Sequence, residues 1–532
     1  MIKSTEPFEV IESLAPEGHA ELVYANRPKN LTGLLKNAVN RYGQREAFID
    51  SNYRLNYKQV DSLINNVASA LHHDWGIEKG DRVVLMLRNG VEFAVSIFAL
   101  ARLGAITVPL NNALKKEELA FQLNDCGASL LITDSEFYEV ITEATSGIKG
   151  IKEVFFTGDE VPGGRAVFSD LLKSGEYPPV TTAVDEDDTA VLLYTSGTTG
   201  RPKGALLSHK GVIASAMNSA WLCALNAGKD RMLVVAPLFH ITGLAMNLCG
   251  AVYSGIPVVF VRRFRTEETL QIIEQERITA MFAVPTILWL MLNSPDFERY
   301  NLKSLRLMAS GGAASPEDLL KYCAVKLPGV QLIPGYGLTE ANGMVHSTTT
   351  IEEALSKPGS SGRPLPVVKA KVVDSSGRDM PPGEPGELLI KGCQVMKGYW
   401  NNLEATRETI VDGWLHTGDI ASITKEDDLY VLDRLKDMII CGGENIYCLE
   451  IENVLYRNSK ILEAAVVGVP DSIFGEQVKA VLVLRPGEQA TEEEIQEFCE
   501  KYLARYKVPK YVEFRVTLPR NPGGKIIKGD LI

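Results

Sequence analysis

Short and long apolar segments alternate along the first half of the chain, and this alternation limits the fold more than any other feature. Runs typical of buried strands alternate with longer stretches at helical spacing, in the order 83–87, 91–103, 106–108, 115–123 and 130–132. The rhythm returns with strand-like runs at 233–235, 258–261 and 305–309. Because the gaps between segments are short, the pattern predicts an α/β fold in which helices cover the faces of parallel sheets.

The chain changes in texture twice toward its C-terminus. From about residue 360 it has short strands separated by Pro/Gly turns such as 381–384, which indicates a β-rich subdomain. The C-terminal part then combines apolar strands with a helix that a capping box of Thr491 and Glu494 opens. Apolar residues at helical spacing predict a buried stripe on this helix, formed by Ile495, Phe498, Cys499, Tyr502, Leu503 and Tyr506.

A chain of 532 residues is too long for one hydrophobic core. The charged run 433–437 lies between two apolar stretches, where the composition places a domain boundary. We therefore predict a large N-terminal domain over 1–432, built of parallel-sheet α/β subdomains and the β-rich subdomain. A hinge at 433–437 would connect it to a small α+β domain over 438–532.

Charge and cysteine usage narrow the functional classes. A formal net charge of −12 argues against a nucleic-acid or anionic-membrane partner, since those surfaces demand clustered Lys and Arg. The eight cysteines have neither zinc-site nor disulfide spacing. The N-terminus lacks the apolar core of a signal peptide, and no stretch is apolar enough for a transmembrane segment. We expect a cytoplasmic protein, for which a homo-oligomer stays open.

Residues 194–204 form an unbroken stretch of hydroxyls, glycines and one lysine, directly after the apolar run 191–193. Hydroxyl groups can donate to phosphate oxygens, and Lys203 adds a positive charge. The spacing of Gly197 and Gly200 to this lysine is not that of a P-loop NTPase. A flexible Ser/Thr/Gly linker is the alternative, but the adjoining buried strand and the single lysine favour a phosphate-binding loop.

Three more segments of small and polar residues follow apolar runs. Gly335, Tyr336, Gly337, Leu338, Thr339 and Glu340 combine a flat aromatic ring, a hydroxyl and a hard oxygen ligand. Segment 310–314 is rich in glycine, which lets a backbone approach a ligand closely. Thr417, Gly418 and Asp419 end in a carboxylate that can accept two hydrogen bonds. Each segment alone could be a simple turn.

Taken in order, these segments resemble the signature motifs of the adenylate-forming superfamily, which includes acyl-CoA synthetases, aryl-CoA ligases, luciferases and the adenylation domains of peptide synthetases. The resemblance spans nearly the whole chain. It implies an ATP site in which Tyr336 stacks on adenine, Asp419 accepts the ribose hydroxyls and Glu340 binds Mg²⁺. The other residues that it assigns to ATP are Thr195, Ser196, Gly197, Thr198, Thr199, Lys203, Gly312, Ala313, Gly335, Gly337, Thr339, Arg434 and Lys525.

The resemblance also implies that the small domain is mobile. Lys436 occupies the hinge position, and Gly442 with Gly443 would let the pantetheine arm of coenzyme A pass. Lys525, presented by a glycine turn close to the C-terminus, corresponds to the catalytic lysine, although a lysine so near the end of a chain is usually solvated. The chain departs from the family at Asp433, where glycine is frequent, and at Cys448, where proline is frequent.

The activity that the resemblance implies is that of an ATP-dependent acyl-CoA synthetase with Lys525, Thr339, Glu340, Lys203 and His240 as catalytic residues. A carboxylic acid is joined to AMP with release of pyrophosphate, and the acyl group then passes to coenzyme A. Amino-acid-activating relatives have aspartate where His240 lies, which argues against an amino acid. The predicted acyl pocket consists of His240, Ile241, Gly311, Gly312, Gly335, Gly343 and Met344, with Met246 as a further adaptable wall.

Several alternatives stay open at this point. A medium- or long-chain fatty acid is the favoured substrate, followed by an aromatic acid of the cinnamate type. An acyl-AMP ligase that loads a carrier protein, a luciferase-like oxygenase and a non-catalytic nucleotide- or acyl-binding sensor are the rival functions. His240 could equally be a buried core or gate residue rather than a substrate contact.

Overall fold

The computed structural model describes residues 8–158, 161, 165–173, 177–195, 201–313, 315–442, 444–520 and 526–532. The chain divides into two compact units. Unit 1 comprises Met1–Ala370 and Ile390–Leu415, and unit 2 comprises Lys371–Leu389 and His416–Ile532. The domain boundaries drawn from composition, with a hinge at 433–437, stay a prediction.

The first sheet of unit 1 contains the alternating segments of the sequence. Its seven strands lie in the order β20 (Gly398–Tyr399), β10 (Lys203–Ser208), β9 (Thr189–Thr195), β6 (Ile106–Pro109), β5 (Arg82–Met86), β7 (Leu130–Asp134) and β8 (Val154–Thr157). Strands β6, β5, β7 and β8 are parallel. The intervening helices are α3 (Val91–Leu103), which ends at Gly104 in the left-handed conformation, and α4 (Lys116–Cys126). The predicted α/β class is confirmed.

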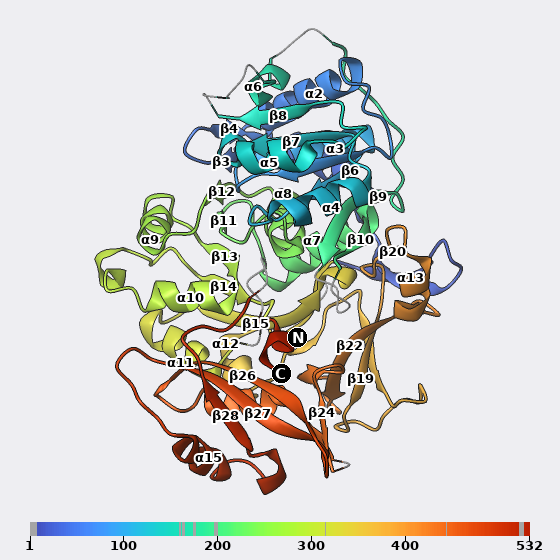
Figure 1. The fold of residues 1–532 in the computed structure, drawn as a ribbon. Coiled ribbons are helices and arrows are strands. Elements are labelled where there is room, and N and C mark those ends of the chain that lie inside the picture. Colours follow the sequence, from blue (N-terminus) through green and yellow to red (C-terminus); the bar gives the residue numbers. More distant parts are fainter. Residues whose placement is uncertain are drawn as a thin grey trace. The chain divides into compact units, whose positions relative to one another are not determined.

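The second sheet of unit 1 has nine strands (Figure 1). Their order is β17 (Arg363–Pro364), β16 (Gly343–Ser347), β15 (Gln331–Leu338), β14 (Leu307–Ser310), β13 (Ala280–Ala283), β11 (Met232–Val234), β12 (Val258–Phe260), β3 (Glu46–Ile49) and β4 (Arg54–Asn56). Strands β11 to β15 are parallel to their neighbours in this group, and β16 returns antiparallel to β15. Because β13, β14 and β15 run the same way, the segments that follow them meet at one edge of the sheet.

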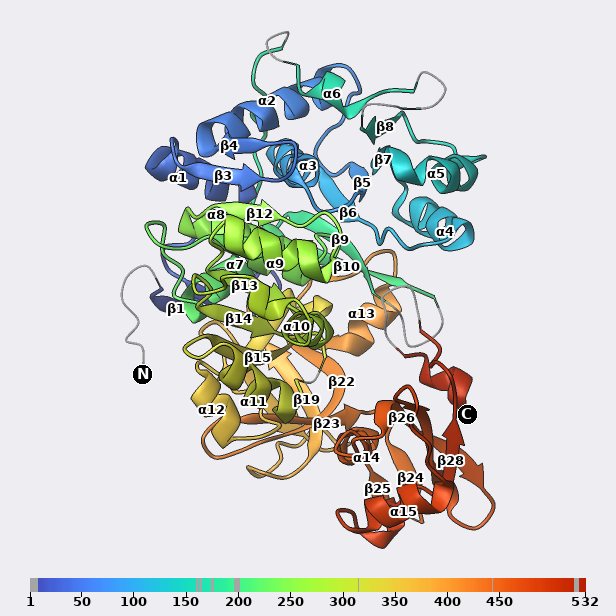
Figure 2. The same cartoon turned by 90° about the vertical axis from the view of Figure 1, so that its left-hand side faces the viewer.

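Helices cover these sheets. Helices α1 (Leu31–Tyr42), α2 (Tyr57–His73) and α3 pack together beside β3 and β4 (Figure 2). Helix α7 (His209–Leu222) packs against the π-helix η3 (Thr242–Cys249) and against α8 (Gly250–Ser254). The other helices of unit 1 are η1 (Ser135–Phe137), α5 (Tyr138–Thr145), α6 (Phe168–Leu171), α9 (Thr266–Gln275), α10 (Pro285–Leu292), η4 (Phe297–Arg299), α11 (Glu317–Lys326), η5 (Thr339–Ala341), α12 (Ile351–Ser356) and α13 (Leu403–Thr409).

Unit 2 is rich in strands, as the short apolar runs and Pro/Gly turns of the sequence predict, and most of these strands pair antiparallel. One sheet contains β18 (Lys369–Val373), β19 (Gly386–Lys391), β22 (Trp414–Ile423) and β23 (Leu429–Arg434). The short β21 (Ile410–Val411), which belongs to unit 1, pairs with Trp414 and Leu415 at the start of β22. The other sheet contains β25 (Glu444–Ile446), β24 (Ile439–Cys441), β27 (Gly475–Leu484), β26 (Ile461–Asp471) and β28 (Tyr511–Phe514). Its helices are α14 (Cys448–Leu455), α15 (Glu492–Glu500), η6 (Arg505–Lys507) and η7 (Lys528–Leu531).

Helix α15 is shorter than its apolar stripe predicts. Thr491 caps it as expected, and its hydroxyl accepts a hydrogen bond from the backbone N–H of Glu494 at 3.2 Å. The helix ends at Glu500, so the two tyrosines beyond it leave the helical stripe. Tyr502 and Tyr506 are 53% and 44% exposed, and their assignment to the core was wrong.

Three further observations concern the described residues. None of its helices has the length and apolar character that crossing a lipid bilayer requires. All eight cysteines are buried free thiols. Hairpin β1 (Val10–Leu14) and β2 (Ala20–Tyr24) stands apart from the two large sheets as an antiparallel pair.

Candidate active site

Strands β9 and β10 hold the two ends of the predicted phosphate-binding loop side by side. Thr195 ends β9, Lys203 begins β10, and the two residues are paired in the ladder. The Thr195 hydroxyl donates to the carbonyl oxygen of Lys203 at 3.4 Å. Ser196, Gly197, Thr198 and Thr199 lie outside the described residues.

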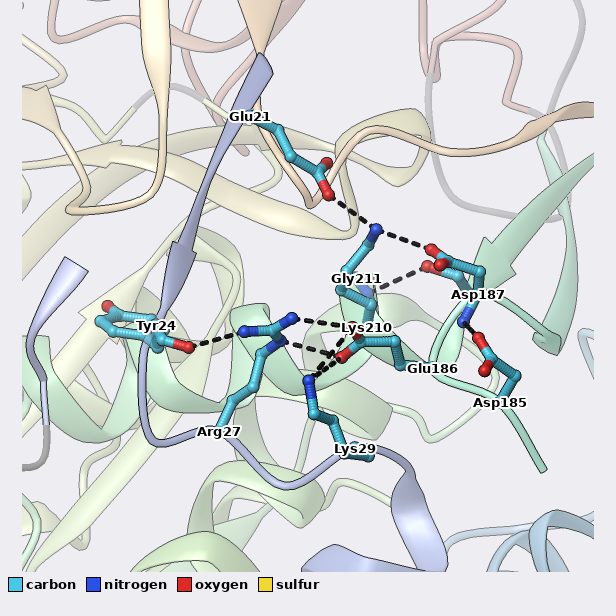
Figure 3. A network of polar contacts seen from close by, with 10 residues as sticks. Glu21, Tyr24, Arg27, Lys29, Asp185, Glu186, Asp187, Lys210 and Gly211 are labelled. Atoms are coloured by element: carbon cyan, nitrogen blue, oxygen red, sulfur yellow. Dashed lines mark hydrogen bonds and ion pairs between the residues drawn. The ribbon is translucent and has the colours of Figure 1, made fainter. Parts of the chain in front are cut away.

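The other end of this strand pair is held by a buried polar network (Figure 3). The Lys210 ammonium contacts Glu21 of β2 and Asp187, which precedes β9, each at 2.6 Å. Beside it, Arg27 donates two hydrogen bonds to Glu186, at 2.8 and 2.9 Å. The network therefore ties the N-terminal hairpin to the segments that lead into β9 and out of β10.

The side chain of Tyr399 contacts both Lys203 and Glu340, the last residue of the second motif. The Lys203 ammonium lies 5.1 Å from the ring centroid of Tyr399, a cation–π distance. The Tyr399 hydroxyl donates to Oε1 of Glu340 at 3.1 Å. Strand β20, which carries Tyr399, pairs with β10, so three segments far apart in sequence converge. Two predicted site residues, Lys203 and Glu340, thus lie together.

Glu340 is the predicted ligand of magnesium. Its carboxylate is partly exposed and accepts a hydrogen bond from Tyr399, while its backbone oxygen accepts one from Met396 at 2.8 Å. In the described part of the chain, no three His, Cys, Asp or Glu side chains form a metal-binding group. Mg²⁺ is usually bound by one or two carboxylates together with substrate phosphates, and that Glu340 supplies such a carboxylate stays a prediction.

The second motif, residues 335–340, comprises the end of β15 and the start of η5, which leads to β16. Tyr336 pairs with His346 in the ladder, and Thr339 begins the short helix η5. A Cβ atom on Gly337 would lie 2.1 Å from the carbonyl oxygen of Gly343, so only glycine fits there. The partly exposed Tyr336 and Thr339 are thereby presented on a rigid strand end.

The predicted acyl-pocket glycines surround a methionine. A Cβ atom on Gly335 would lie 2.5 Å from Sδ of Met344, and one on Gly311 would lie 3.6 Å from its Cε. Gly312, at φ +81°, and Ala313 are exposed just after β14. The space that the glycines leave is thus taken by the Met344 thioether, and their contact with an acyl group stays a prediction.

His240 is exposed, so its interpretation as a buried core residue is wrong. Its ring lies beside that of Phe239, with 4.7 Å between centroids, and its carbonyl oxygen accepts the backbone N–H of Leu244 at 3.0 Å. It precedes the π-helix η3, whereas its neighbour Ile241 is buried. π-Helical segments frequently occur at functional sites.

In unit 2, the predicted ribose ligand Asp419 pairs with Arg434. The Asp419 side chain is 4% exposed and lies 2.7 Å from Nε of Arg434, whose side chain is 44% exposed. Strands β22 and β23 place the two residues opposite each other. The guanidinium therefore offsets the negative charge of a carboxylate that is almost fully buried.

The two departures from the family pattern are joined by a hydrogen bond. The backbone N–H of Cys448, at the start of α14, donates to Oδ2 of Asp433, whose Oδ1 accepts the backbone N–H of Arg434 at 2.8 Å. Burial raises the pKa of Asp433, and the charge of Lys528 opposes this rise. Lys528 itself lies 2.8 Å from Glu452 of α14. The bond links the first residue of the predicted hinge to the segment that follows the hinge.

Other predicted residues of unit 2 are placed individually. Lys436 is exposed, with its ammonium 3.9 Å from Asp437. Gly442 has φ +61° and donates its backbone N–H to the carbonyl oxygen of Phe474 at 2.8 Å. Gly443 and Lys525 lie outside the described residues.

The sequence patterns missed two partners of the site. Tyr399 is about two hundred residues away from Lys203, and no local motif marks it. The Asp433–Cys448 bond could have been suspected, because proline at position 448 would have no N–H to donate.

Comparison with known proteins decides the family. The family model described as AMP-binding enzyme matches residues 35–400, and the model of the AMP-binding enzyme C-terminal domain matches 450–525. The chain belongs to the AMP-binding enzyme family. The first match covers more than half of the chain, and the two together span it nearly from end to end, as the resemblance predicted.

Curated relatives and solved structures agree with this assignment. A long-chain-fatty-acid–CoA ligase of Bacillus subtilis is 35% identical over 95% of this chain and 94% of the relative. A feruloyl-CoA synthase of Amycolatopsis sp is 38% identical over 90% of this chain and 93% of the relative. The structure of o-succinylbenzoate CoA synthetase from Bacillus subtilis with its acyl-adenylate has a TM-score of 0.83 at 32% identity, covering 94% of this chain and 97% of that one.

These matches confirm the class of enzyme. The chain is an AMP-forming acid–thiol ligase, an acyl-CoA synthetase of the adenylate-forming superfamily. It uses ATP with Mg²⁺ and coenzyme A; the same o-succinylbenzoate CoA synthetase was also solved with ATP and a magnesium ion.

Proposed function

We propose that the protein joins a free medium- or long-chain fatty acid to AMP and then to coenzyme A, in the cytoplasm, where both co-substrates are found. The observation that carries the proposal is the convergence of Thr195, Lys203, Tyr399 and Glu340. It brings a hydroxyl, a cation and a carboxylate to the mouth of a loop whose composition suits phosphate. Whether the chain works as a homo-oligomer is a separate question.

In the first half-reaction the protein has to align two anions and offset their charge. An oxygen of the acid attacks the α-phosphorus, and pyrophosphate leaves. Thr195, the loop 196–199, Thr339 and Lys203 would hold the phosphates, Tyr336 would stack on adenine, and Asp419 with Arg434 would bind the ribose. Magnesium supplies charge stabilisation when it is bound, and Glu340 would hold it. Lys525 would contact both the acid and the α-phosphate.

In the second half-reaction the thiol of coenzyme A attacks the acyl-AMP carbonyl, and AMP leaves. We propose that the small domain turns about Lys436, so that Lys525 withdraws and Gly442 and Gly443 admit the pantetheine arm. A hinge needs only a few residues that absorb a dihedral change. The exposed side chain of Lys436 is compatible with such a turn.

The acid would lie among His240, Ile241, Gly311, Gly312, Gly335, Gly343 and Met344. An aromatic acid is the second candidate, because one of the relatives is a feruloyl-CoA synthase. The exposure of His240 at the start of η3 supports a role at the mouth of this site rather than in the core.

The test uses a panel of fatty and aromatic acids with the full-length protein. Exchange of labelled pyrophosphate into ATP reports adenylation, and mass detection of acyl-CoA reports the thioester. We expect acid-dependent exchange and an acyl-CoA product. Acyl-AMP without a thioester would favour a ligase that loads a carrier protein, and no exchange with any acid would contradict the proposal.

The lysine variant separates the two half-reactions. We expect Lys525→Ala to lose pyrophosphate exchange but still convert supplied acyl-AMP to acyl-CoA. Lys501→Ala, at an exposed lysine of the same unit, is the matched control and keeps both. Equal damage to both half-reactions by Lys525→Ala would argue against the domain turn.

A further inference from the structure

One face of helix α7 carries small residues and lies against the turn after Glu340. Gly211, Ser215 and Ser219 are four residues apart and so share this face. A Cβ atom on Gly211 would lie 2.6 Å from Nδ2 of Asn342, and one on Gly343 would lie 3.4 Å from Oγ of Ser215. The Ser219 hydroxyl donates to the carbonyl oxygen of Met246 in η3 at 2.9 Å. Helix α7, η3 and the start of β16 thus enclose one buried region.

Four buried side chains of these contacting elements have polar atoms without a hydrogen-bond partner within the described residues. These atoms are Oγ of Ser215, Oδ1 of Asn342, both amide atoms of Asn247 and both ring nitrogens of His346. All four side chains are at most 1% exposed. Buried polar groups are almost always paired, because an unpaired one loses its hydration without compensation.

Other buried polar groups on these elements do have hydrogen-bond partners, so loose packing of the whole region does not explain the unpaired atoms. The Asn218 amide donates to Oε1 of Gln394 at 2.5 Å, and its own oxygen accepts the Tyr24 hydroxyl at 2.5 Å. The Gln394 backbone oxygen accepts the Asn342 amide at 2.7 Å. Asn342 therefore has a paired nitrogen that contacts a satisfied network and an oxygen that has no partner within the described residues.

His346 adds a neutral ring to this set. Burial lowers its pKa to about 3, so the imidazole is uncharged at neutral pH. A neutral imidazole offers one donor and one acceptor. Together the four residues offer both donors and acceptors, and they carry no net charge.

Two flexible thioether side chains occupy the space next to these atoms. A Cβ atom on Gly343 would lie 3.3 Å from Sδ of Met246 and 3.4 Å from Oγ of Ser215. Met344 lies against Gly311 and Gly335. Methionine has three rotatable bonds and fills irregular gaps. Met246 and Ser215 both lie against Gly343, so an acid that displaced Met246 would come close to the Ser215 hydroxyl.

We propose that Ser215, Asn247, Asn342 and His346 select an acid that carries a hydroxyl or carbonyl oxygen at the end remote from its carboxylate. The inference rests on the proposed function, since it concerns the acid of that reaction. It refines the choice within both fatty and aromatic acids. A plain alkyl or aryl end would leave the buried polar atoms unpaired, whereas an oxygenated end would pair with them.

The test compares acids that differ by one hydroxyl group. The pairs are 4-hydroxycinnamate with cinnamate and 10-hydroxydecanoate with decanoate, assayed by pyrophosphate exchange. In at least one pair we expect kcat/KM to be about tenfold or more higher for the hydroxylated acid, since a site built to pair a substrate hydroxyl discriminates strongly. If acids support exchange but the plain member is equal or better in both pairs, the inference is wrong. If no acid supports exchange, the proposed function fails instead.

Variants connect the preference to these residues. We expect Ser215→Ala and Asn247→Leu to lower the ratio of kcat/KM within the preferred pair about fivefold, mainly by loss on the hydroxylated acid. Ser219→Ala is the matched control on the same helix face, because its hydroxyl already has a partner. It should leave the ratio unchanged.

Thermal stability distinguishes selection from a structural role. Alanine differs from serine only by the hydroxyl that is unpaired at position 215, so Ser215→Ala should keep or raise Tm while the preference falls. A lower Tm with an unchanged ratio would overturn the inference. So would an unchanged ratio in both Ser215→Ala and Asn247→Leu, whatever their stability.

Discussion

Replacing Lys210 with methionine removes one cation from the network beneath the β9–β10 pair. Methionine keeps most of the apolar stem but leaves Glu21 and Asp187 without the ammonium that contacts each at 2.6 Å. The side chains of Lys210 and Glu21 are 7% and 5% exposed, whereas that of Asp187 is 34% exposed. The variant therefore leaves one carboxylate buried and unpaired, while the other can regain water.

The magnitude follows from this difference in burial. Breaking a buried ion pair by removing one partner costs about 3–5 kcal/mol, whereas an exposed pair is worth about 0–1 kcal/mol. Because only Glu21 is fully buried, we expect Lys210→Met to lower the free energy of unfolding of unit 1 by about 3 kcal/mol. Adding Glu21→Leu should restore most of it, since an apolar pair of similar volume is tolerated where a lone charge is not.

Urea unfolding followed by intrinsic fluorescence measures both variants and, with Glu21→Leu alone, completes a double-mutant cycle. Lys29→Met is the control, because Lys29 pairs with Glu186 at 3.2 Å but its side chain is 64% exposed. It should cost less than about 1 kcal/mol. If Lys210→Met cost no more than Lys29→Met, or if the double variant were less stable than Lys210→Met, the argument from burial would be refuted.

Three further predictions follow from local geometry. Burial lowers the pKa of His209 from 6.5 to about 4, so its contribution to stability is complete above pH 6.5 and is lost as the pH falls toward 4. The loss is about 1.4 kcal/mol per pH unit. In His209→Leu, Tm measured from pH 7 to pH 4 should therefore fall less steeply than in the wild type, and an unchanged slope of Tm against pH would contradict this. Tyr399→Phe removes the hydroxyl that donates to Glu340. The Mg²⁺ concentration that gives half-maximal pyrophosphate exchange should therefore rise about threefold to tenfold, and an unchanged concentration would mean that Tyr399 does not influence magnesium binding. Gly337→Ala places a Cβ 2.1 Å from the carbonyl oxygen of Gly343 and should lower both Tm and exchange rate, the latter by more than about tenfold; wild-type exchange would show that the turn adapts.

Much of the fold could be predicted because the parallel strands are continuous apolar runs. Helix α3 has the predicted bounds, and β5, β6 and β7 lie within two residues of theirs. The pattern failed at the end of α15, where Tyr502 and Tyr506 continue the helical spacing beyond the last turn. Tyrosine tolerates exposure through its hydroxyl, so spacing alone could not place the end of the helix.

The candidate site was predictable only where its residues are contiguous. Segment 335–340 is a single motif, and its position at the end of β15 follows from the apolar run before it. The contact of Lys203 with Tyr399 depends on the pairing of β10 with β20, which no local pattern encodes. The exposure of His240 likewise depends on how η3 packs, and its residue type allowed either outcome.

The link between Asp433 and Cys448 restricts how this hinge can be exchanged with those of its relatives. Proline at position 448 alone would remove the N–H that donates to the buried Asp433 carboxylate. Glycine at position 433 alone would leave the backbone N–H of Cys448, at the start of α14, without its acceptor. The two positions depend on each other through this hydrogen bond. A chimera that takes residue 433 from one parent and residue 448 from the other should therefore fold less well than one that takes both from the same parent.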